Sequence, residues 1–358
     1  MTPLTASQTI LPAIHRTRAF LFGRFRWRTF LKLSLVAAFT EGVSIRMQYT
    51  VGHTAQATAS ASASTPADFL SHWLWLIGLV FVLGVPLAVL ALYLVTRLRF
   101  AFFHCLTHNS TELRPGWTLY AHQSMRLFEV SLAVWAVWAL VAGSLLYPLF
   151  SRYLTLDAQS GPKGFNDFTT ALTFGLSSFF TFLFLYALIW IADTILHDFL
   201  LPHMALENLS VTQSWDQFLL RATTDPSAFS TYFGERFILP IIGYMAFSLA
   251  AAILGTILSA LVSVPLATTE ALVRTGSVAG GLLAAFVLLP LAIVAFAVAV
   301  FVSLCFGGPL ATWIRNFALL FYAGRYQALA DLLTPGETRA VILPPPAGTE
   351  AAPPPPSI

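Results

Sequence analysis

The chain has 358 residues, of which 57% are hydrophobic and only 10% carry a charged side chain, with a formal net charge of +3. A soluble domain of this size needs much more polar surface than these residues supply. The composition therefore excludes an ordinary soluble globular protein and indicates a chain embedded in lipid.

The first 28 residues form a basic lead in which aromatic rings alternate with arginines, as at Phe25-Arg26-Trp27. This pattern is typical of a segment that lies on anionic lipid headgroups with its rings at the acyl boundary. Nucleic acid is the rival partner for a basic run. The aromatic spacing and the apolar segment that follows already account for the charge, so membrane lipid is the expected partner and nucleic acid is not.

Six segments are predicted to cross the membrane as helices. Five of them lie, to within two residues at their ends, in stretches of 22 or more residues without Asp, Glu, Lys or Arg. About 20 apolar residues are enough to cross the hydrocarbon at 1.5 Å per residue. The first segment is shorter, because Lys32 and Glu41 lie near its ends. The predicted spans are 29–45, 69–96, 128–150, 168–192, 237–262 and 278–306.

The sequence therefore predicts an all-α fold, a polytopic transmembrane helical bundle at 29–323. It is preceded by the cytoplasmic lead at 1–28 and followed by a proline-rich tail at 324–358, which we expect to be disordered. With six crossings, 15 of the 19 Lys and Arg residues fall on one side of the membrane. Basic residues that flank spans stay in the cytoplasm, so both termini are predicted to be cytoplasmic.

Two cytoplasmic loops are predicted to carry amphipathic helices that lie on the membrane. In the later loop, Ser210 and Gln213 form a capping-box pattern ahead of an apolar stripe over 215–222. In the earlier loop, Pro115 suits the first turn of a helix whose stripe continues to Ser124. A third interfacial stripe is predicted after the last span, over 310–321.

The two loops also share residues at a nearly constant offset. His104 and Asn109 recur as His203 and Asn208, 99 residues later, and Trp117 recurs as Trp215 after 98 residues. The pattern predicts an internal duplication. Its two units would enter the membrane in the same direction and be related by an axis along the membrane normal.

Four side chains in these loops are candidate metal ligands. His104 and His108 lie four residues apart on one helix face, and His203 and Glu207 repeat that spacing. The alternative is that these histidines lie at the membrane interface and bind lipid phosphate or backbone groups. The sequence has no His-Glu-x-x-His run, no acidic cluster predicted to point into the spans and no phosphate-binding loop. We therefore expect no enzymatic activity and no cofactor.

The leading hypothesis is a non-enzymatic membrane protein that organises lipid or binds a protein partner, or a second copy of itself. The alternative is a transporter or permease for a small or lipid-like molecule, suggested by the duplication and by Pro86, Pro240 and Pro290, which could kink their spans. Ion-coupled carriers keep ionisable groups within their spans. In the five long uncharged stretches only His72, near an outer end, is such a group, which favours the first hypothesis.

Several short motifs together resemble an uncharacterised family of bacterial multi-pass inner-membrane proteins. They are His15-Arg16-Thr17-Arg18, Thr107-His108-Asn109, the approach from Pro202 to Trp215, and Phe317-Ala318-Leu319-Leu320-Phe321-Tyr322. The loop from Glu207 to Trp215 is also distantly similar to the membrane domain of some glycerophosphodiester phosphodiesterases. The resemblance implies an inner-membrane location. It transfers no catalytic residue, because the hydrolytic chemistry of those enzymes belongs to a separate soluble domain.

Overall fold

The computed structural model describes residues 5–23, 25–41, 66–160, 168–274 and 278–333, and this part of the chain is helical, with no strand. The predicted all-α class is therefore confirmed. The loop at 42–65 and residues 334–358 of the predicted tail lie outside the described residues, whereas residues 327–333, at the start of the tail predicted over 324–358, are helical. The helices are α1 (Ala6–Phe22), α2 (Trp27–Thr40), α3 (Pro66–Thr107), α4 (Leu113–Leu119), α5 (Ala121–Ser160), α6 (Phe168–Thr194), the π-helical turn η2 (Ile195–Leu200), α7 (Leu201–Leu206), α8 (Val211–Thr224), α9 (Pro226–Arg274), α10 (Val278–Ala323) and α11 (Gln327–Leu333).

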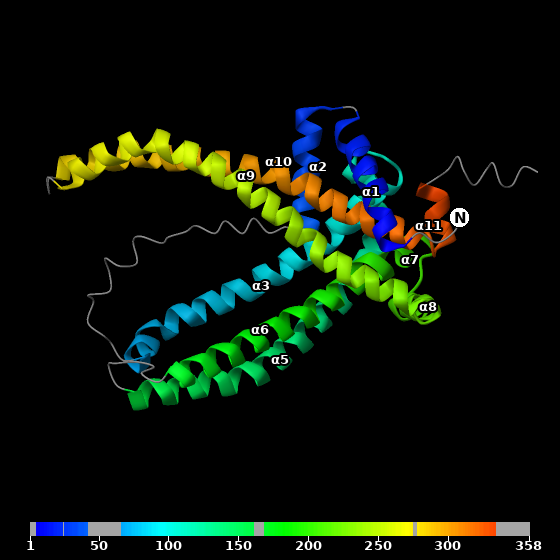
Figure 1. Ribbon diagram of the computed structural model, residues 1–358, viewed down its shortest axis with the longest axis horizontal. Coiled ribbons are helices and arrows are strands. Elements are labelled where there is room, and N and C mark those ends of the chain that lie inside the picture. Colours follow the sequence, from blue (N-terminus) through cyan, green and yellow to red (C-terminus); the bar gives the residue numbers. More distant parts are fainter. Residues whose placement is uncertain (1–4, 24, 42–65, 161–167, 275–277, 334–358) are drawn as a thin grey trace, which may run out of the picture.

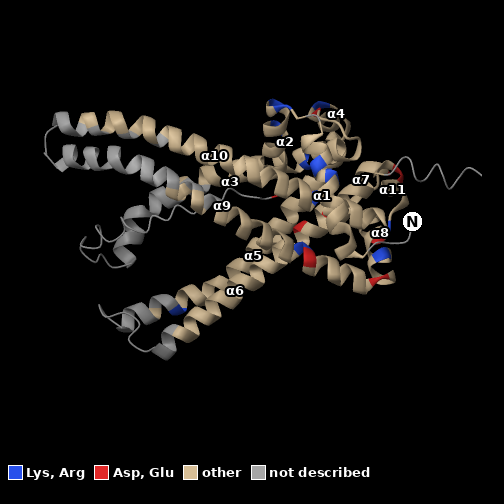
Figure 2. Ribbon diagram, turned by 45° about the horizontal axis from the view of Figure 1, so that its top comes forward, with Lys and Arg blue, Asp and Glu red and all other residues tan. Residues whose placement is uncertain are grey.

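The molecule consists of a compact head from which three long arms diverge (Figure 1). One arm is α3, the second is the hairpin of α5 and α6, and the third is the hairpin of α9 and α10. The short helices, with α1 and α2, gather in the head around the near ends of the arms. Almost all described acidic and basic side chains lie in the head, while the arms are nearly uncharged (Figure 2).

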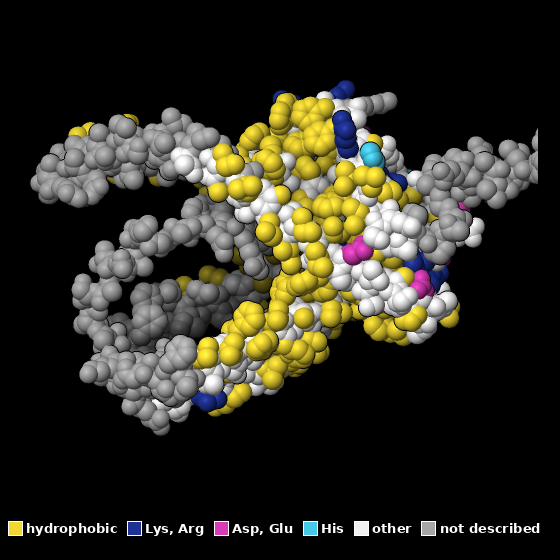
Figure 3. All heavy atoms as spheres, in the orientation of Figure 1, with side chains coloured by type: hydrophobic (Ala, Val, Ile, Leu, Met, Phe, Trp, Pro, Cys, Tyr) yellow, Lys and Arg dark blue, Asp and Glu magenta, His cyan; other side chains and the backbone are white. Residues whose placement is uncertain are grey.

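Four described helical stretches are long and apolar enough to cross a membrane. They are Val82–Thr107, Ala121–Arg152, Leu172–Leu206 and Ala285–Ala323. Between 0% and 17% of the residues in their most apolar windows are buried within the protein, and apolar side chains cover much of the described arm surface on the face that Figure 3 shows. A soluble monomer rarely exposes apolar patches of this extent. These four helices indicate a membrane protein.

The two other predicted spans are not among these four. Helix α2 ends at Thr40, and residues 42–45 of the predicted span lie outside the described residues. The 14 residues of α2 extend about 21 Å, less than the thickness of the hydrocarbon. It also runs across the direction of the arms (Figure 1). The predicted span at 237–262 lies within α9, which is 49 residues long but includes side chains outside the described part of the chain.

A close approach of two backbones holds α2 against α10. A methyl group added at Gly308 of α10 would overlap the backbone of Ser34 in α2. We therefore predict that Gly308→Ala lowers the free energy of unfolding by about 1–3 kcal/mol, because the helices must separate. Gly234→Ala is the control, since no atom lies within 4 Å of its added methyl group. Thermal unfolding in one detergent compares the two, and an equally stable Gly308→Ala variant would contradict the packing.

The predicted interfacial helices have three different outcomes. The helix predicted in the later loop is confirmed as α8, including the capping box of Ser210 and Gln213, while its place on the membrane stays a prediction. The helix predicted over 115–126 is broken at Tyr120, where α4 ends and α5 begins. The third stripe does not form a separate interfacial helix. Helix α10 continues unbroken to Ala323, and its stripe packs inside the head, where Phe317 is fully buried.

The repeated residues of the predicted duplication adopt the same backbone conformation. Asn109 and Asn208 have φ values of 50° and 54°, and they are the non-glycine residues with positive φ in the described part of the chain. Each follows the end of a long helix, where a left-handed residue ends the helix. Phe100 and Phe199, also 99 residues apart, are both fully buried in the head. These shared features support the duplication.

The left-handed conformation makes a specific mutational prediction. Asn208→Gly should keep the stability of the protein, because glycine adopts positive φ without steric cost. Asn208→Val should lower the free energy of unfolding by about 1–2 kcal/mol, because its Cβ crowds the carbonyl group in this conformation. Thermal unfolding of both variants tests this, with the Asn109 pair as an internal repeat. Equal stability of the glycine and valine variants would contradict the conformation.

Candidate functional site

Charged residues at the ends of the uncharged sequence runs converge where the arms meet the head. The runs end in sequence at Arg97, Glu129, Asp193, Arg236 and Arg315. In the folded chain, Arg236 of α9 and Arg315 of α10 share acidic partners, and Asp193 pairs with an arginine of α3. These residues therefore lie at one end of each uncharged run, where an apolar helix meets the charged head.

Two arginines and two acidic residues form a buried network where the arms meet the head. Arg236 donates through Nη2 to Glu41 Oε2 at 2.9 Å and through Nε to Asp198 Oδ2 at 3.1 Å. Arg315 Nη1 donates to Asp198 Oδ1 at 2.7 Å, and its Nε lies 3.8 Å from Glu41 Oε1. The Tyr232 hydroxyl donates to Asp198 Oδ2 at 2.7 Å. We call these five residues the ionic hub.

The ionic hub joins four elements that are far apart in sequence. Glu41 caps α2, Asp198 lies in η2, Arg236 belongs to α9 and Arg315 to α10. Asp198 is 1% exposed and Arg315 is 2% exposed. Two positive and two negative charges leave the hub neutral, and each charged group has an oppositely charged partner, as burial requires. The hub therefore fixes the angle between the head and one arm.

The π-helical turn η2 positions the acidic centre of the hub, and Pro202 gives a local reason for it. Proline has no N–H, so Pro202 cannot donate to the carbonyl of Asp198, and its ring clashes with that carbonyl in a regular α-helix. The chain widens instead, and the Leu201 N–H bonds to the carbonyl of Leu196, five residues earlier. Such bulges are frequent at functional sites.

A second charged cluster lies beside the hub. Arg99 of α3 donates to both carboxylate oxygens of Asp193, at 2.9 and 3.2 Å, and also contacts the ring of His197. The His197 Nδ1 lies 2.8 Å from the Asp193 carbonyl and 3.0 Å from its carboxylate. Arg99 Nε donates to the carbonyl of Thr40 at 2.6 Å, next to Glu41 in the hub. The two clusters are thus continuous and connect all three arms.

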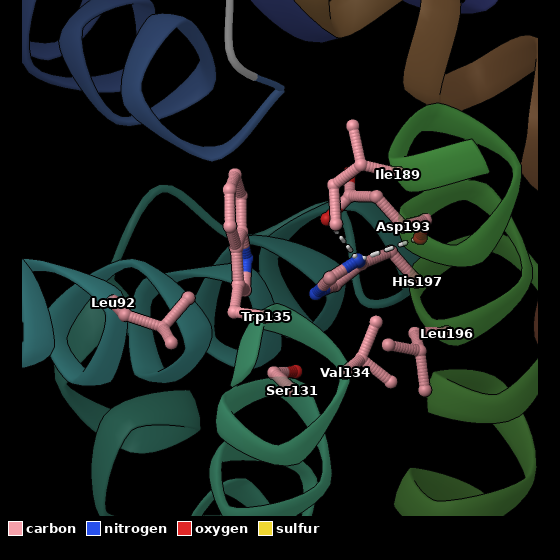
Figure 4. Close-up of a pocket in the computed structure, with 8 residues that line it drawn as sticks. All are labelled: Leu92, Ser131, Val134, Trp135, Ile189, Asp193, Leu196 and His197. Carbon is pink, nitrogen blue, oxygen red and sulfur yellow. Dashed lines mark hydrogen bonds and ion pairs between the residues drawn. The ribbon is translucent and has the colours of Figure 1, made fainter. Parts of the chain in front are cut away.

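A small pocket opens next to this second cluster, between α3, α5 and the end of α6. Its lining includes Ser131, Trp135, Asp193 and His197, and its volume is about 10 Å³, close to the size of one water molecule. Trp135 stands opposite Asp193 and His197, and Ser131 lies one helical turn before it (Figure 4). Ser131 is 3% exposed, and its hydroxyl has no hydrogen-bond partner.

The structure keeps the four candidate metal ligands in two separate pairs. His104 stacks on His108 with ring centroids 4.3 Å apart. His203 is buried, shares a 2.7 Å hydrogen bond with the Tyr322 hydroxyl and lies 3.5 Å from Glu207. Nowhere among the described residues do three His, Cys, Asp or Glu side chains form a group that could hold a metal ion. The geometry of these pairs fits packing and hydrogen bonding within the head.

An ion pair near the C-terminal end secures the far side of the head. Arg325 donates to Asp225 Oδ2 at 3.0 Å and lies over the ring of Phe321, 4.3 Å from its centroid. The hydrogen bond from Arg325 lowers the pKa of Asp225. This pair connects the α8–α9 corner with the start of α11.

The ionic hub was not predicted from the sequence, which gave no acidic cluster near the spans. Two signals point toward it. Its arginines directly flank uncharged runs, and Asp198 stands four residues before a proline within an apolar helix. The angle between the arms cannot be read from the sequence. That angle determines which of the charged residues at the ends of the uncharged runs come into contact.

Comparison with known proteins identifies a family for this chain, and that family has no assigned activity. No curated protein and no solved structure matches the chain. One family model matches residues 4–332, nearly the whole chain, and it is described as a family of unknown function, DUF7544. The match includes the helices described above except for Leu333, the last residue of α11. The protein therefore belongs to the DUF7544 family.

Proposed function

We propose that this is a non-enzymatic integral membrane protein that organises lipid or a protein partner from the cytoplasmic face of a bacterial inner membrane. The arms are seated in the bilayer, and the ionic hub lies where the hydrocarbon ends. One observation carries the proposal: three apolar arms diverge from a charged, tightly packed base, and almost none of their apolar surface is covered by the protein itself. Lipid or apolar partner helices are what such surfaces bind.

The ends of the described chain support a topology with both termini on one side. Arg16 of α1 donates to the carbonyl of Leu333 at 3.3 Å, so the first and last helices are neighbours in the head. Five long helices form the arms. Both termini on one side require an even number of crossings, and the sixth predicted crossing, at 29–45, lies partly outside the described residues.

The corner between α1 and α2 supports lipid as a partner. Phe22, Phe25 and Trp27 are 43% to 56% exposed there, and the nearby Arg26 and Arg28 are also exposed. Rings at the acyl boundary with arginines among the headgroups are the arrangement of a membrane-surface anchor. The opposite face of α1 packs on α10, which ties this anchor to the third arm.

Reconstitution into liposomes tests the proposal against its alternative. The purified protein should bind lipid and resist extraction by carbonate, and it should show no saturable flux of small solutes. Lipid binding should weaken when Arg26 and Arg28 are both replaced by glutamine, because these groups face anionic headgroups. Specific, saturable uptake would overturn the proposal and favour a permease. Release of the chain by carbonate would overturn both.

A further inference from the structure

The pocket beside the second charged cluster presents an acceptor surface. The Asp193 side chain is 47% exposed, whereas Arg99 behind it is 12% exposed. A carboxylate has about four acceptor positions. Arg99 occupies two of them and His197 a third, so the remaining position is open on the exposed side. Arg99 uses its donors on Asp193, His197 and the Thr40 carbonyl, which leaves the positive charge enclosed.

Two further groups of the pocket suit a cation. The buried hydroxyl of Ser131 has no partner within the protein, and a hydroxyl can accept a hydrogen bond. The indole of Trp135, 43% exposed, stands across from Asp193, and an indole face attracts a cation. An open carboxylate position, a free hydroxyl and an indole are complementary to an ammonium group and not to a phosphate.

The position of the pocket indicates where such a cation comes from. Leu92, Ser131 and Asp193 each lie within four residues of the end of an uncharged run, on three different helices. The pocket is therefore at the depth where hydrocarbon meets the headgroups. Its apolar walls continue along α3 and α5 as exposed leucines such as Leu90 and Leu132. A ligand with an acyl chain can extend along these walls while its headgroup enters the pocket.

We propose that this pocket binds the primary ammonium of a phospholipid headgroup, as in phosphatidylethanolamine. The pocket has room for about one water-sized group, so a primary ammonium can approach Asp193 and donate hydrogen bonds there, whereas the trimethylammonium of phosphatidylcholine has no N–H to donate. Asp193 holds the ammonium by charge, Ser131 accepts one of its hydrogens, and Trp135 covers its open side. This inference rests on the proposed lipid-organising function and names the lipid class.

Lipid titration of the full-length protein in detergent, followed by native mass spectrometry, tests the site. Phosphatidylethanolamine should bind about tenfold more tightly than phosphatidylcholine, since one ammonium contact of this kind is worth about one order of magnitude. Ser131→Val, which fills the pocket and leaves every ion pair intact, should abolish the preference. Asp193→Asn should also abolish it. Ser144→Val, at an exposed position of the same helix, is the control and should retain the preference.

Four outcomes overturn the inference. Equal binding of the two lipids by the natural protein means that the pocket holds only a water molecule. If Ser131→Val still prefers phosphatidylethanolamine to phosphatidylcholine, a different site on the protein is responsible for that preference. Preference for phosphatidylglycerol over phosphatidylethanolamine means that phosphate, not ammonium, is recognised. Free ethanolamine that competes at the same concentration as the lipid makes the ligand a soluble amine. In each of these cases the protein can still bind lipid elsewhere. The proposed lipid-organising function fails by a different result, namely that no lipid binds to the protein at all.

Discussion

Asp198→Asn is expected to lower the free energy of unfolding by about 3–5 kcal/mol, the range for breaking one partner out of a buried ion pair. Asp198 accepts from Arg236, Arg315 and Tyr232 while it is 1% exposed. Asparagine keeps the shape but leaves Arg236 and Arg315, which are 12% and 3% exposed, with Glu41 as their one acidic partner among the described residues. Denaturant or thermal unfolding in one detergent, followed by circular dichroism, measures the loss.

Two companion variants separate charge from shape. Asp225→Asn removes the acid of the Arg325 pair, and it should cause a smaller loss, because the Asp225 side chain is 40% exposed and water can replace part of the interaction. The double variant Asp198→Asn with Arg315→Met removes one charge of each sign and should recover much of the stability. A loss for Asp198→Asn no larger than that for Asp225→Asn would contradict the role of the hub.

Leu140→Lys is expected to reduce membrane insertion by about 2.5–3.5 kcal/mol, the cost of a lysine at the centre of a transmembrane helix. Leu140 lies at the middle of the second arm and is 75% exposed. Leu220→Lys, on α8 in the head, is the control. Leu220 is 63% exposed, but a lysine there can extend into the headgroup layer and should leave insertion nearly unchanged.

Cell-free synthesis in the presence of liposomes measures this difference through the carbonate-resistant fraction of each variant. Similar fractions for Leu140→Lys and Leu220→Lys would mean that the arm does not lie in hydrocarbon. Leu140→Ile serves as a second control, because it changes shape without adding charge.

The sequence predicts the elements of this fold well where one physical rule dominates. Uncharged runs give the long helices, and the capping box at Ser210 gives the start of α8, because hydropathy and capping are local properties. The shared left-handed conformation of Asn109 and Asn208 agrees with the duplication predicted from their spacing. The apolar stripe after the last span was misassigned, since an apolar face that packs inside the head has the same period as one that lies on lipid.

The candidate site depends on properties that are not local. The ionic hub requires α2 to end at Thr40 and to run across the direction of the arms. The hydropathy of a short apolar segment does not show whether it packs across other helices in this way or crosses a membrane. Glu41 marks the end of a short apolar segment in the sequence, but it is a buried partner of Arg236 in the folded chain. The pocket likewise combines residues of α3, α5 and η2 that no sequence spacing connects.

The central claim is that the arms lie in hydrocarbon and that the hub and pocket mark its cytoplasmic boundary. Site-directed spin labels at positions 140 and 220, in a variant with Cys105 and Cys305 replaced by alanine, report depth through accessibility to oxygen and to a water-soluble nickel complex. We predict that the label at 140 is accessible to oxygen and shielded from nickel, while the label at 220 lies at the headgroup level. Equal accessibility of both labels to the nickel complex would contradict the claim.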